Sequence, residues 1–421
     1  MAYPKLVINM DKIRDNARSI VSCCYEAGIA VSGVVKVVGS DPKISELVYN
    51  QGCESLASSR LSEIKKLSDY WDAKEVVHAA TSHRKPKFHL IRIPMLSEME
   101  DVVKYVDTCL ISDVRIAREA EHLSTRACER LEGAPRGCPA RDERNGVYRE
   151  HLSTRACEER HEDDATRRQK ASRLSVLLMI ELGDLREGIW NKDELISTAL
   201  EIESMQHVHL KGVATNLGCY GAIRPTRDKL QELVNAAELI ESKIGRRLET
   251  ISGGGYTSLP LVWAGEMPER INHLRVGEGI LIGYDVEKST MLPAAGFESG
   301  TIVLQAEVVE SRVKPTHPIG EILLDAFRVK PTYDDFGEQA RVIVAVGRGD
   351  YGATDGITPR NQNLKIIGAS SDHTLLMDKI GDEMKNSLPN SILDRKTGVF
   401  VSEIELGRES RVVGGRTATS D

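Results

Sequence analysis

The stretch VSGVVKVVGSDP, residues 31–42, decides the predicted fold of the N-terminal part of the chain. It is a run of β-branched residues that holds one lysine, Lys36, and it breaks at a Gly-Ser-Asp-Pro sequence. Such a run is typical of a strand buried on both faces, as in a parallel sheet. Asp41 and Pro42 are residue types preferred at the N-cap and the first position of a helix. The stretch therefore predicts a strand, with Lys36 near its C-terminal end, that leads through a short loop into a helix.

Lys36 is a candidate catalytic residue because of its place on this strand. In α/β barrels the active site lies at the C-terminal ends of the strands. Apolar surroundings remove solvation from an ammonium group, so we expect a lowered pKa for Lys36 and a free amine that acts as a nucleophile. The alternative is a lysine that extends to solvent from the strand end. This stretch alone supports both interpretations about equally.

The composition sets bounds on the class of protein. A chain of 421 residues is long enough for two or three domains with a large core. The net charge of -7, with no basic domain, argues against nucleic-acid binding. We find no signal peptide and no apolar run long enough to span a membrane. The eight cysteines follow no zinc-site or disulfide spacing. A cytoplasmic protein with reduced thiols and no bound metal is the simplest expectation.

Strand-like and helix-like segments alternate through most of the chain. We predict eight strands, at residues 31–37, 55–57, 88–93, 108–111, 175–181, 209–215, 249–252 and 273–275. Helices are predicted between them, near residues 42–51, 60–70, 96–105, from 113 onward, 192–203 and 226–244. Such alternation implies parallel βαβ units, and eight of them imply a closed (β/α)8 barrel of the TIM type. We assign this α/β barrel domain to residues 1–298.

The pattern changes after the barrel. Residues 301–311, 341–347 and 364–368 are β segments separated by Pro and Gly turns. We predict a mostly β C-terminal domain over residues 299–421, and the N-terminal strand at residues 6–9 is a candidate to join it.

One region stands apart within the barrel domain. The sequence EHLSTRACE occurs at residues 121–129 and again at 150–158. Two copies do not make a solenoid. Residues 130–168 are dense in Arg and Glu, so we predict a solvated or disordered insertion near residues 121–170. A duplication in a surface loop is preferred over a partner-binding arm.

Polar residues follow several predicted barrel strands. Arg186, after the fifth strand, has a planar guanidinium suited to a carboxylate. The alternative for it is a surface ion pair with Asp184 or Glu187. Three glycines at 253–255, followed by hydroxyl residues, suit a phosphate-binding nest, although a glycine run is usually a turn. Arg275 on the eighth strand adds a cation beside this loop.

A lysine, arginines and a phosphate nest at one barrel mouth point to a phosphorylated aldehyde cofactor held as a Schiff base. Pyridoxal 5'-phosphate is the obvious candidate.

Several motifs carry a resemblance to a known family. The chain resembles the alanine/ornithine racemase family of pyridoxal-phosphate enzymes, and is most similar to its ornithine racemase branch. The motifs cover most of residues 1–120 and 170–375 and are specific together: YPKLVINMDKIRDNA, GVVKVVGSDP, LIRIPMLSEMEDVVKY, LLMIELGDLREGI, GVATNLGCYG, TISGGGYTSL, EMPERINHLRVGEGILIG and IIGASSDH.

The resemblance implies roles for individual residues. Lys36 would bind the cofactor covalently and act as one of two catalytic bases. Arg186 would brace the substrate carboxylate, and Asn216 would lie against the cofactor ring. Arg275 would face the pyridine nitrogen, which favours racemisation over transamination. The implied surroundings of the phosphate and the rest of the cofactor are Ser252, Gly254, Gly255, Tyr256, Thr257, Gly277 and Glu278.

The second base and the dimer also follow from the resemblance. Asp372 would reach the partner subunit's active site, so the family implies a homodimer with shared sites. The family supplies the second base from a segment that matches residues 347–352, where Arg348 takes the tyrosine position. Asp350, Tyr351 and His373 stay open as candidates. The polar tail from residue 386 departs from the family pattern, because we do not find the family's closing β segment with its tyrosine there.

We therefore predict a pyridoxal-phosphate-dependent racemase that interconverts the L- and D-forms of a small or basic amino acid such as ornithine. The alternatives are a non-catalytic pyridoxal-phosphate carrier, a decarboxylase or aldolase on the same barrel, and an α/β protein without cofactor. The β domain argues against the carrier, since related single-barrel proteins lack one.

Overall fold

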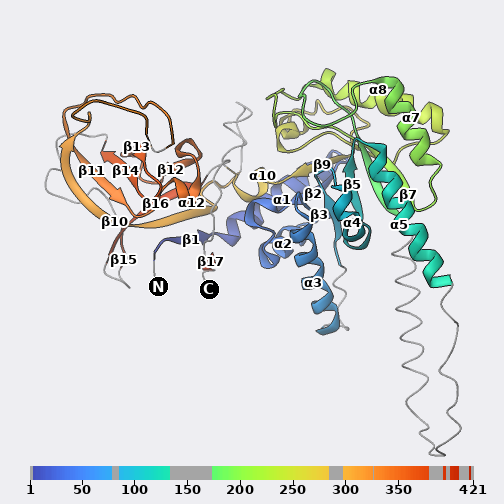
Figure 1. The fold of residues 1–421 in the computed structure, drawn as a ribbon, viewed down its shortest axis with the longest axis horizontal. Coiled ribbons are helices and arrows are strands. Elements are labelled where there is room, and N and C mark those ends of the chain that lie inside the picture. The colour runs from blue at the N-terminus through green and yellow to red at the C-terminus, as the bar shows by residue number, and fades with distance from the viewer. Residues whose placement is uncertain are drawn as a thin grey trace, which may run out of the picture. The chain divides into compact units, whose positions relative to one another are not determined.

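The computed structural model describes residues 3–77, 85–132, 173–283, 297–325, 327–378, 392–394, 399–406 and 417–418. The chain divides into two compact units (Figure 1). The barrel unit is Val21–Gly277, and the β unit combines Met1–Ile20 with Glu278–Asp421. Compared with the predicted division at residues 298 and 299, the N-terminal strand and the segment after Gly277 group with the β unit.

The barrel unit contains a closed barrel of parallel strands in sequence order, from β2 to β9. Pairing of β2 with β9 closes it, with Ser32 opposite Arg275. All the predicted barrel strands are present, and most bounds differ by one to three residues. The strands are β2 (Ala30–Val34), β3 (Ser55–Ser58), β4 (Lys87–Leu90), β5 (Thr108–Ile111), β6 (Leu174–Met179), β7 (Val208–Ala214), β8 (Thr250–Ser252) and β9 (His273–Val276).

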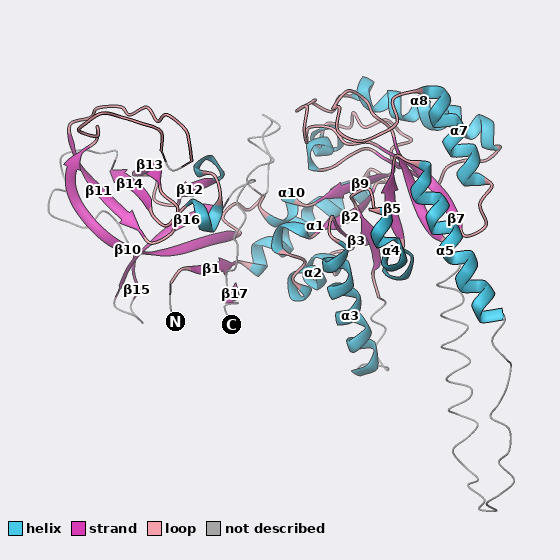
Figure 2. Cartoon of the chain, viewed as in Figure 1, coloured by secondary structure: helices cyan, strands magenta, loops and turns pink. Residues whose placement is uncertain are grey.

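Helices follow the strands and flank the barrel (Figure 2). Their starts are fixed by caps that the sequence contains: Asp41 accepts the backbone N–H groups of Lys43 and Ile44, and Thr226 accepts that of Lys229. The helices are α1 (Met10–Glu26), α2 (Pro42–Tyr49), α3 (Leu61–Val77), α4 (Met99–Tyr105), α5 (Val114–Glu132), α7 (Lys192–Glu203), α8 (Arg227–Ile244), α9 (Leu259–Trp263) and α10 (Glu278–Leu281).

The strand that carries the opening stretch ends earlier than predicted. β2 stops at Val34, and Lys36–Val38 form a 3-10 turn that ends at Gly39, whose φ is 57°. Backbone N–H groups in this turn bond locally, from Val38 to the carbonyl of Val35 and from Gly39 to that of Lys36. The prediction of a strand through residue 37 is therefore wrong at its end, although the helix after Asp41 is confirmed.

The β unit is built on a mainly antiparallel sheet, which confirms the predicted β-rich C-terminal region, and the N-terminal strand joins it. β1 (Lys5–Ile8) pairs with β10 (Ile302–Pro315). The main path runs β12-β16-β10-β11-β14-β13. The other elements are β11 (Glu338–Val344), α12 (Arg348–Tyr351), β12 (Ile357–Pro359), β13 (Leu364–Ala369), β14 (Thr374–Asp378), β15 (Ile392–Asp394), β16 (Val399–Leu406) and β17 (Thr417–Ala418).

The polar tail contributes a strand that we did not predict. β16 lies between β12 and β10, and its sequence VFVSEIEL alternates apolar and polar residues near its end. The expectation that the tail lacks the family's closing β segment is therefore wrong for the strand, although no tyrosine follows residue 386.

The first copy of the repeated sequence, residues 121–129, lies in α5. The second copy, and the rest of the predicted insertion from residue 133 to 172, lie outside the described residues. None of the described helices is long and apolar enough to cross a membrane.

Candidate active site

The barrel brings the predicted site residues of this unit to one end. Because its strands are parallel, their C-terminal ends open on the same mouth. Lys36 follows β2, Arg186 follows β6, Asn216 follows β7, Ser252 ends β8 and Arg275 lies in β9. β2 and β9 are neighbours, so Lys36 follows the strand beside Arg275.

Arg275 is the buried cation of this mouth. Its Nη1 donates to Ser252 Oγ at 2.5 Å, and its Nη2 donates to the Thr215 carbonyl at 2.7 Å and to Asn216 Oδ1 at 2.6 Å. Its Nε–H has no acceptor among the described residues. Burial lowers the pKa of Arg275 to about 10, so it stays charged at neutral pH. The second hydrogen of Nη1 has no acceptor among the described residues either. A fixed, buried guanidinium with two uncommitted N–H donors can recognise an acceptor atom on a ligand.

Asn216 connects Arg275 to a second arginine. Its Nδ2 donates to Glu187, whose carboxylate also accepts both Nε and Nη2 of Arg186. This hydrogen bonding to Glu187 raises the pKa of Arg186. The alternative of an ion pair between Arg186 and Glu187 is therefore present, and it is continuous with the Arg275 cluster. The side chain of Arg186 is still 40% exposed, which leaves a guanidinium edge for a carboxylate.

Two carboxylates shape the loops that carry these side chains. Glu181 accepts the backbone N–H groups of Gly183, Leu185 and Arg186. Asp184 is fully buried and accepts the N–H groups of the loop after β7, including those of Gly218 and Tyr220 at 3.0 Å.

Burial alone would raise the pKa of Asp184, but its backbone donors outweigh burial and lower it. We expected Asp184 only as an ion-pair partner of Arg186. The sequence offers no local sign that it bonds a loop some 34 residues away.

The glycine loop after β8 has the geometry of a close backbone approach. Gly254 has a φ of 102°, a conformation that favours glycine, and Gly255 lies against the Arg275 carbonyl. Tyr256–Ser258 form a 3-10 turn that leads into α9. The hydroxyl of Thr257 donates to the Leu217 carbonyl at 3.1 Å. The Thr257 hydroxyl proton is already used in this bond. We therefore expect an anion at this loop to be bound by backbone N–H groups.

Lys36 differs from its expected environment. Its side chain is exposed, because the 3-10 turn carries it past the end of the buried strand. The prediction that Lys36 loses its solvation is therefore wrong for the chain by itself. An exposed amine at the mouth is accessible to an aldehyde without any movement of the barrel.

The β unit holds the remaining predicted residues. Backbone N–H groups of Arg348 and Gly349 donate to the carbonyls of Ser370 and Ser371, which brings the Asp350 and Asp372 segments together. Asp350 accepts the N–H of Gly347 at 2.9 Å, and Asp372 is exposed.

Tyr351 is fully buried, and burial raises its pKa. Its hydroxyl lies 2.6 Å from that of Thr374, which donates to the Val346 carbonyl. The tyrosine is therefore the donor of this pair. Glu278 begins α10, and Gly277 follows β9 directly.

Sequence reasoning missed a polar row inside the barrel. His273 lies two residues before Arg275 in β9, so both side chains are on the inward face of that strand. Ser32, opposite Arg275 on the neighbouring strand β2, is buried as well. His89 on β4 is also buried. The alternation His-Leu-Arg-Val in β9 is the one local signal that could have indicated it.

Comparisons with known proteins show the family to which this chain belongs. The model of the alanine racemase N-terminal domain matches residues 151–285. The ornithine racemase of Acetoanaerobium sticklandii is 32% identical over 374 residues, 89% of this chain and 89% of that protein. This chain belongs to the alanine/ornithine racemase family. The prediction of an amino-acid racemase is confirmed at this level.

Other relatives extend the similarity over nearly the whole racemase. The lysine racemase of Thermotoga maritima is 30% identical over 411 residues, 96% of this chain and 99% of that protein. The fold of the racemase matches that of alanine racemase from Clostridium difficile 630 with a TM-score of 0.58 and 14% identity. That match covers 99% of this chain and 89% of the other. The predicted barrel with a β C-terminal region is therefore confirmed.

Proposed function

We propose that this racemase uses pyridoxal 5'-phosphate to interconvert the L- and D-forms of a basic amino acid such as ornithine. The observation that carries the proposal is the buried Arg275, which is fixed by hydrogen bonds and whose Nε–H meets no acceptor in the part of the chain that the structure describes. We place the enzyme in the cytoplasm, with an amino acid as its partner molecule and no nucleic acid or membrane.

The residues at the mouth fit the cofactor. Lys36 is an exposed amine for the aldehyde, and the loop at Gly254 and Gly255 allows close approach of a phosphate. Arg275 stays protonated and can only donate, so a ring nitrogen opposite it would accept and remain unprotonated. When bound, the cofactor supplies an electron sink that acidifies the α-proton of an amino acid.

Three side chains at the barrel mouth would each have a different role in the reaction. The free amine of Lys36 would take and return a proton on one face of the substrate α-carbon. Arg186 would hold the substrate carboxylate, and its bond to Glu187 limits the rotation of its side chain. Asn216 would fix the position of Arg186 relative to Arg275, because it accepts from Arg275 and donates to Glu187, which binds Arg186.

The substrate class is supported by the relatives. The two named above are an ornithine racemase and a lysine racemase, whose substrates both carry a side-chain ammonium. Glu187 is already bonded to Arg186 and Asn216. We therefore propose that Glu278 or Asp350 meets the substrate ammonium.

The second base is proposed to come from the β unit, on the opposite face of the substrate. Asp350 and Asp372 remain the candidates, since each has a carboxylate oxygen that accepts no backbone N–H from the described residues. Tyr351 would first have to break its hydrogen bond to Thr374.

We propose a homodimer in which the β unit of one subunit completes the site of the other. The loop between β10 and β11 supports it, because large apolar side chains are exposed there. Ile319 is 92% exposed, and Leu323 and Leu324 are exposed nearby. Such a patch is typical of a protein interface. Sedimentation of the purified holoenzyme would test the dimer, with a monomer at micromolar concentration contradicting it.

The test of the function begins with visible absorption of the purified protein incubated with pyridoxal phosphate. We expect a yellow band that borohydride bleaches, and no such band in Lys36→Ala. Lys43→Ala is the matched control, because Lys43 is an exposed lysine in the next helix. A band that persists in Lys36→Ala would contradict the assignment of Lys36.

Turnover is then followed as exchange of the α-proton in deuterium oxide with L- and D-ornithine, lysine and alanine. We expect exchange and interconversion of the basic amino acids, with conserved mass. Cofactor binding without exchange would favour the carrier. Loss of carbon dioxide, or carbon–carbon cleavage, would favour the decarboxylase or aldolase.

A further inference from the structure

A chain of buried hydrogen bonds runs from Arg275 into the barrel interior. Ser252 Oγ, which accepts from Arg275, lies 2.8 Å from Nδ1 of His273. Nε2 of His273 lies 2.8 Å from Ser32 Oγ, and Ser32 Oγ lies 2.6 Å from Ser55 Oγ. Every member of this chain is buried. Barrel interiors are usually filled by branched apolar side chains, so a polar row here needs an explanation.

The imidazole of His273 is neutral in this setting. Burial, with the positive charges of Arg275 and Lys211, lowers its pKa to about 3. A neutral imidazole has one donor and one acceptor nitrogen, so it passes a hydrogen bond on in one direction.

The direction of the chain follows from its first donor. Arg275 can only donate, so Ser252 Oγ accepts from it. The Ser252 hydroxyl proton then has Nδ1 of His273 as its acceptor among the described residues. Nε2–H of His273 in turn donates to Ser32, and Ser32 donates to Ser55 or His89. All the donors point away from the arginine, an arrangement in which each bond strengthens the next.

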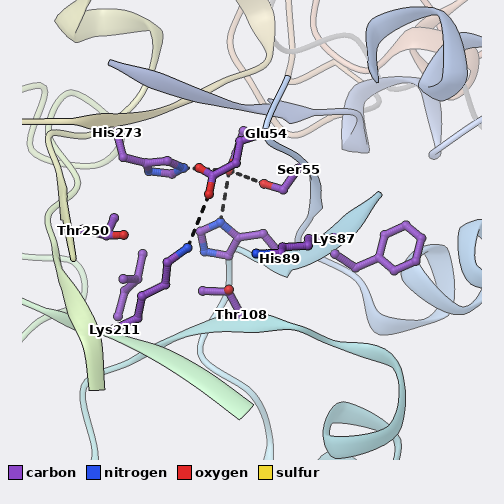
Figure 3. Close-up of a pocket in the computed structure, with 11 residues that line it drawn as sticks. Glu54, Ser55, Lys87, His89, Thr108, Lys211, Thr250 and His273 are labelled. Atoms are coloured by element: carbon purple, nitrogen blue, oxygen red, sulfur yellow. Dashed lines mark hydrogen bonds and ion pairs between the residues drawn. The ribbon is translucent and has the colours of Figure 1, made fainter. Parts of the chain in front are cut away.

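The chain ends at a small cavity near the N-terminal ends of the strands (Figure 3). His89 lies 3.4 Å from Ser32 Oγ through Nδ1, and its Nε2 is buried without a partner among the described residues. The cavity, about 10 Å³, is lined by His89, Thr108 and the pair of Lys211 with Glu54 at 3.5 Å. It has the size and polarity for one water molecule, which would satisfy His89.

We propose that His273 is a positioning residue of the racemase: through Ser252 it holds the guanidinium of Arg275 in its orientation toward the ligand. Of the three oxygens that accept from Arg275, only Ser252 Oγ belongs to a rotatable hydroxyl, and Nδ1 of His273 sets the direction of that hydroxyl. Without the acceptor nitrogen of His273, the Ser252 hydroxyl has no fixed direction. Its proton can then turn toward the N–H of Arg275 and weaken the hydrogen bond that Ser252 Oγ accepts from it. The inference rests on the proposed function, since it gives Arg275 the task described above.

The first test uses the cofactor-free protein and no activity. Nitrogen-15 NMR of histidine-labelled protein should show the buried imidazoles of His273 and His89 neutral from pH 5 to 8, and the Nε2–H resonance pair of His273 should be the one absent in His273→Asn. A protonated or Nδ1–H imidazole at this position would overturn the proposal.

The second test compares variants of the loaded enzyme. His273→Leu removes both bonds, and we expect kcat for ornithine to fall roughly tenfold with little change in KM, the worth of one hydrogen bond. The visible band of the bound cofactor should shift as well. His273→Asn keeps an acceptor near the Nδ1 position and should recover most of both properties.

The control is His209→Leu, which removes an imidazole of β7 that pairs with Glu249 and that is not among the described partners of Arg275. It should leave kcat and the band unchanged. Equal kcat and spectra for His273→Leu and the unmodified protein would overturn the inference while leaving the proposed function intact. If His273→Leu does not fold, Ser32→Ala, which cuts the chain one residue further, is measured in its place. If the unmodified protein binds no cofactor, the proposed function itself fails.

Discussion

The side chain of Asn216 joins the two arginines of the barrel mouth, since it accepts from Nη2 of Arg275 at 2.6 Å and donates to Glu187. Glu187 in turn holds Arg186. The loops after β6 and β7 and the strand β9 are therefore connected by one set of charged hydrogen bonds. Bonds of this type are stronger than those between neutral groups and fix geometry as well as charge.

Replacement of Arg275 by lysine should disable the site while keeping its charge. A lysine has one nitrogen and cannot reach Ser252, Thr215 and Asn216 together. We expect kcat for ornithine to fall by roughly 10²-fold or more, as when a preorganised donor is removed. Chiral chromatography of the product measures it. A kcat within about twofold of the unmodified enzyme would show that the fork geometry is unimportant.

Asn216→Leu should cost both stability and substrate binding. It leaves a buried donor of Arg275 without its acceptor, a loss of roughly 1–3 kcal/mol in the free energy of unfolding. Arg186 should also become mobile, so KM should rise more than kcat falls. Urea unfolding and steady-state kinetics measure these effects. Asn235→Leu is the control, because Asn235 is an exposed amide on α8. Equal effects of the two substitutions would contradict the bridging role.

Two glycines of the loop after β6 should respond differently to alanine. Gly183 and Gly188 both have positive φ, of 108° and 140°. A Cβ on Gly183 would meet nothing within 4 Å, whereas one on Gly188 would lie 2.6 Å from the Glu181 backbone nitrogen. Gly183→Ala should lose about 1–2 kcal/mol for its backbone conformation alone. Gly188→Ala should lose several kcal/mol and misplace Arg186. Calorimetry measures the loss of stability in each variant, and KM reports the position of Arg186. Equal losses of stability in the two variants would contradict the prediction.

Tyr351→Phe separates a structural from a catalytic hydroxyl. The Tyr351 hydroxyl bonds Thr374 inside the β unit, so its loss should lower stability by roughly 1 kcal/mol. We expect kcat to stay within about twofold, because a committed, buried hydroxyl is poorly placed to act as a base. Loss of α-proton exchange from one enantiomer only would identify Tyr351 as the second base. Asp350→Asn and Asp372→Asn are measured beside it.

The buried histidines should make the barrel sensitive to acid. His273 stays neutral down to about pH 3 in the folded chain, and the pKa of His89 is also lowered by burial and by the charges of His273, Arg275 and Lys211. Unfolded, each would take up a proton below about pH 6.5. The unfolded state therefore binds more protons between pH 6.5 and 3, so stability is full above this window and is lost as the pH falls.

The expected slope is about 1.4 kcal/mol per pH unit for each such histidine. Urea unfolding of the cofactor-free protein from pH 7 to 5 measures it. His273→Asn should reduce the slope, whereas His209→Asn should not. An unchanged slope in His273→Asn would contradict this account.

Much of the fold follows from local patterns. The apolar runs at β2, β5 and β6 predict strands because burial on both faces requires such runs. The starts of α2 and α8 follow from Asp41 and Thr226, whose side chains cap backbone groups within three residues. The end of β2 was misplaced because Val37 and Val38 favour a strand, whereas the local bonds of a 3-10 turn prevail. The strand β16 was missed because two of its three partners, β10 and β12, are distant in the sequence, and pairing over that distance leaves no local pattern.

For this protein, the sequence by itself determined the eight barrel strands, the glycine loop at the mouth, and the residue types that carry the racemase resemblance. These depend on side-chain polarity and backbone freedom at neighbouring positions. Only the tertiary structure decided that Lys36 is exposed, that Asn216 joins Arg186 to Arg275, and that His273 reaches Arg275 through Ser252. The barrel closes β2 onto β9 across more than two hundred residues, and a hydrogen bond over that separation leaves no periodic trace in the sequence.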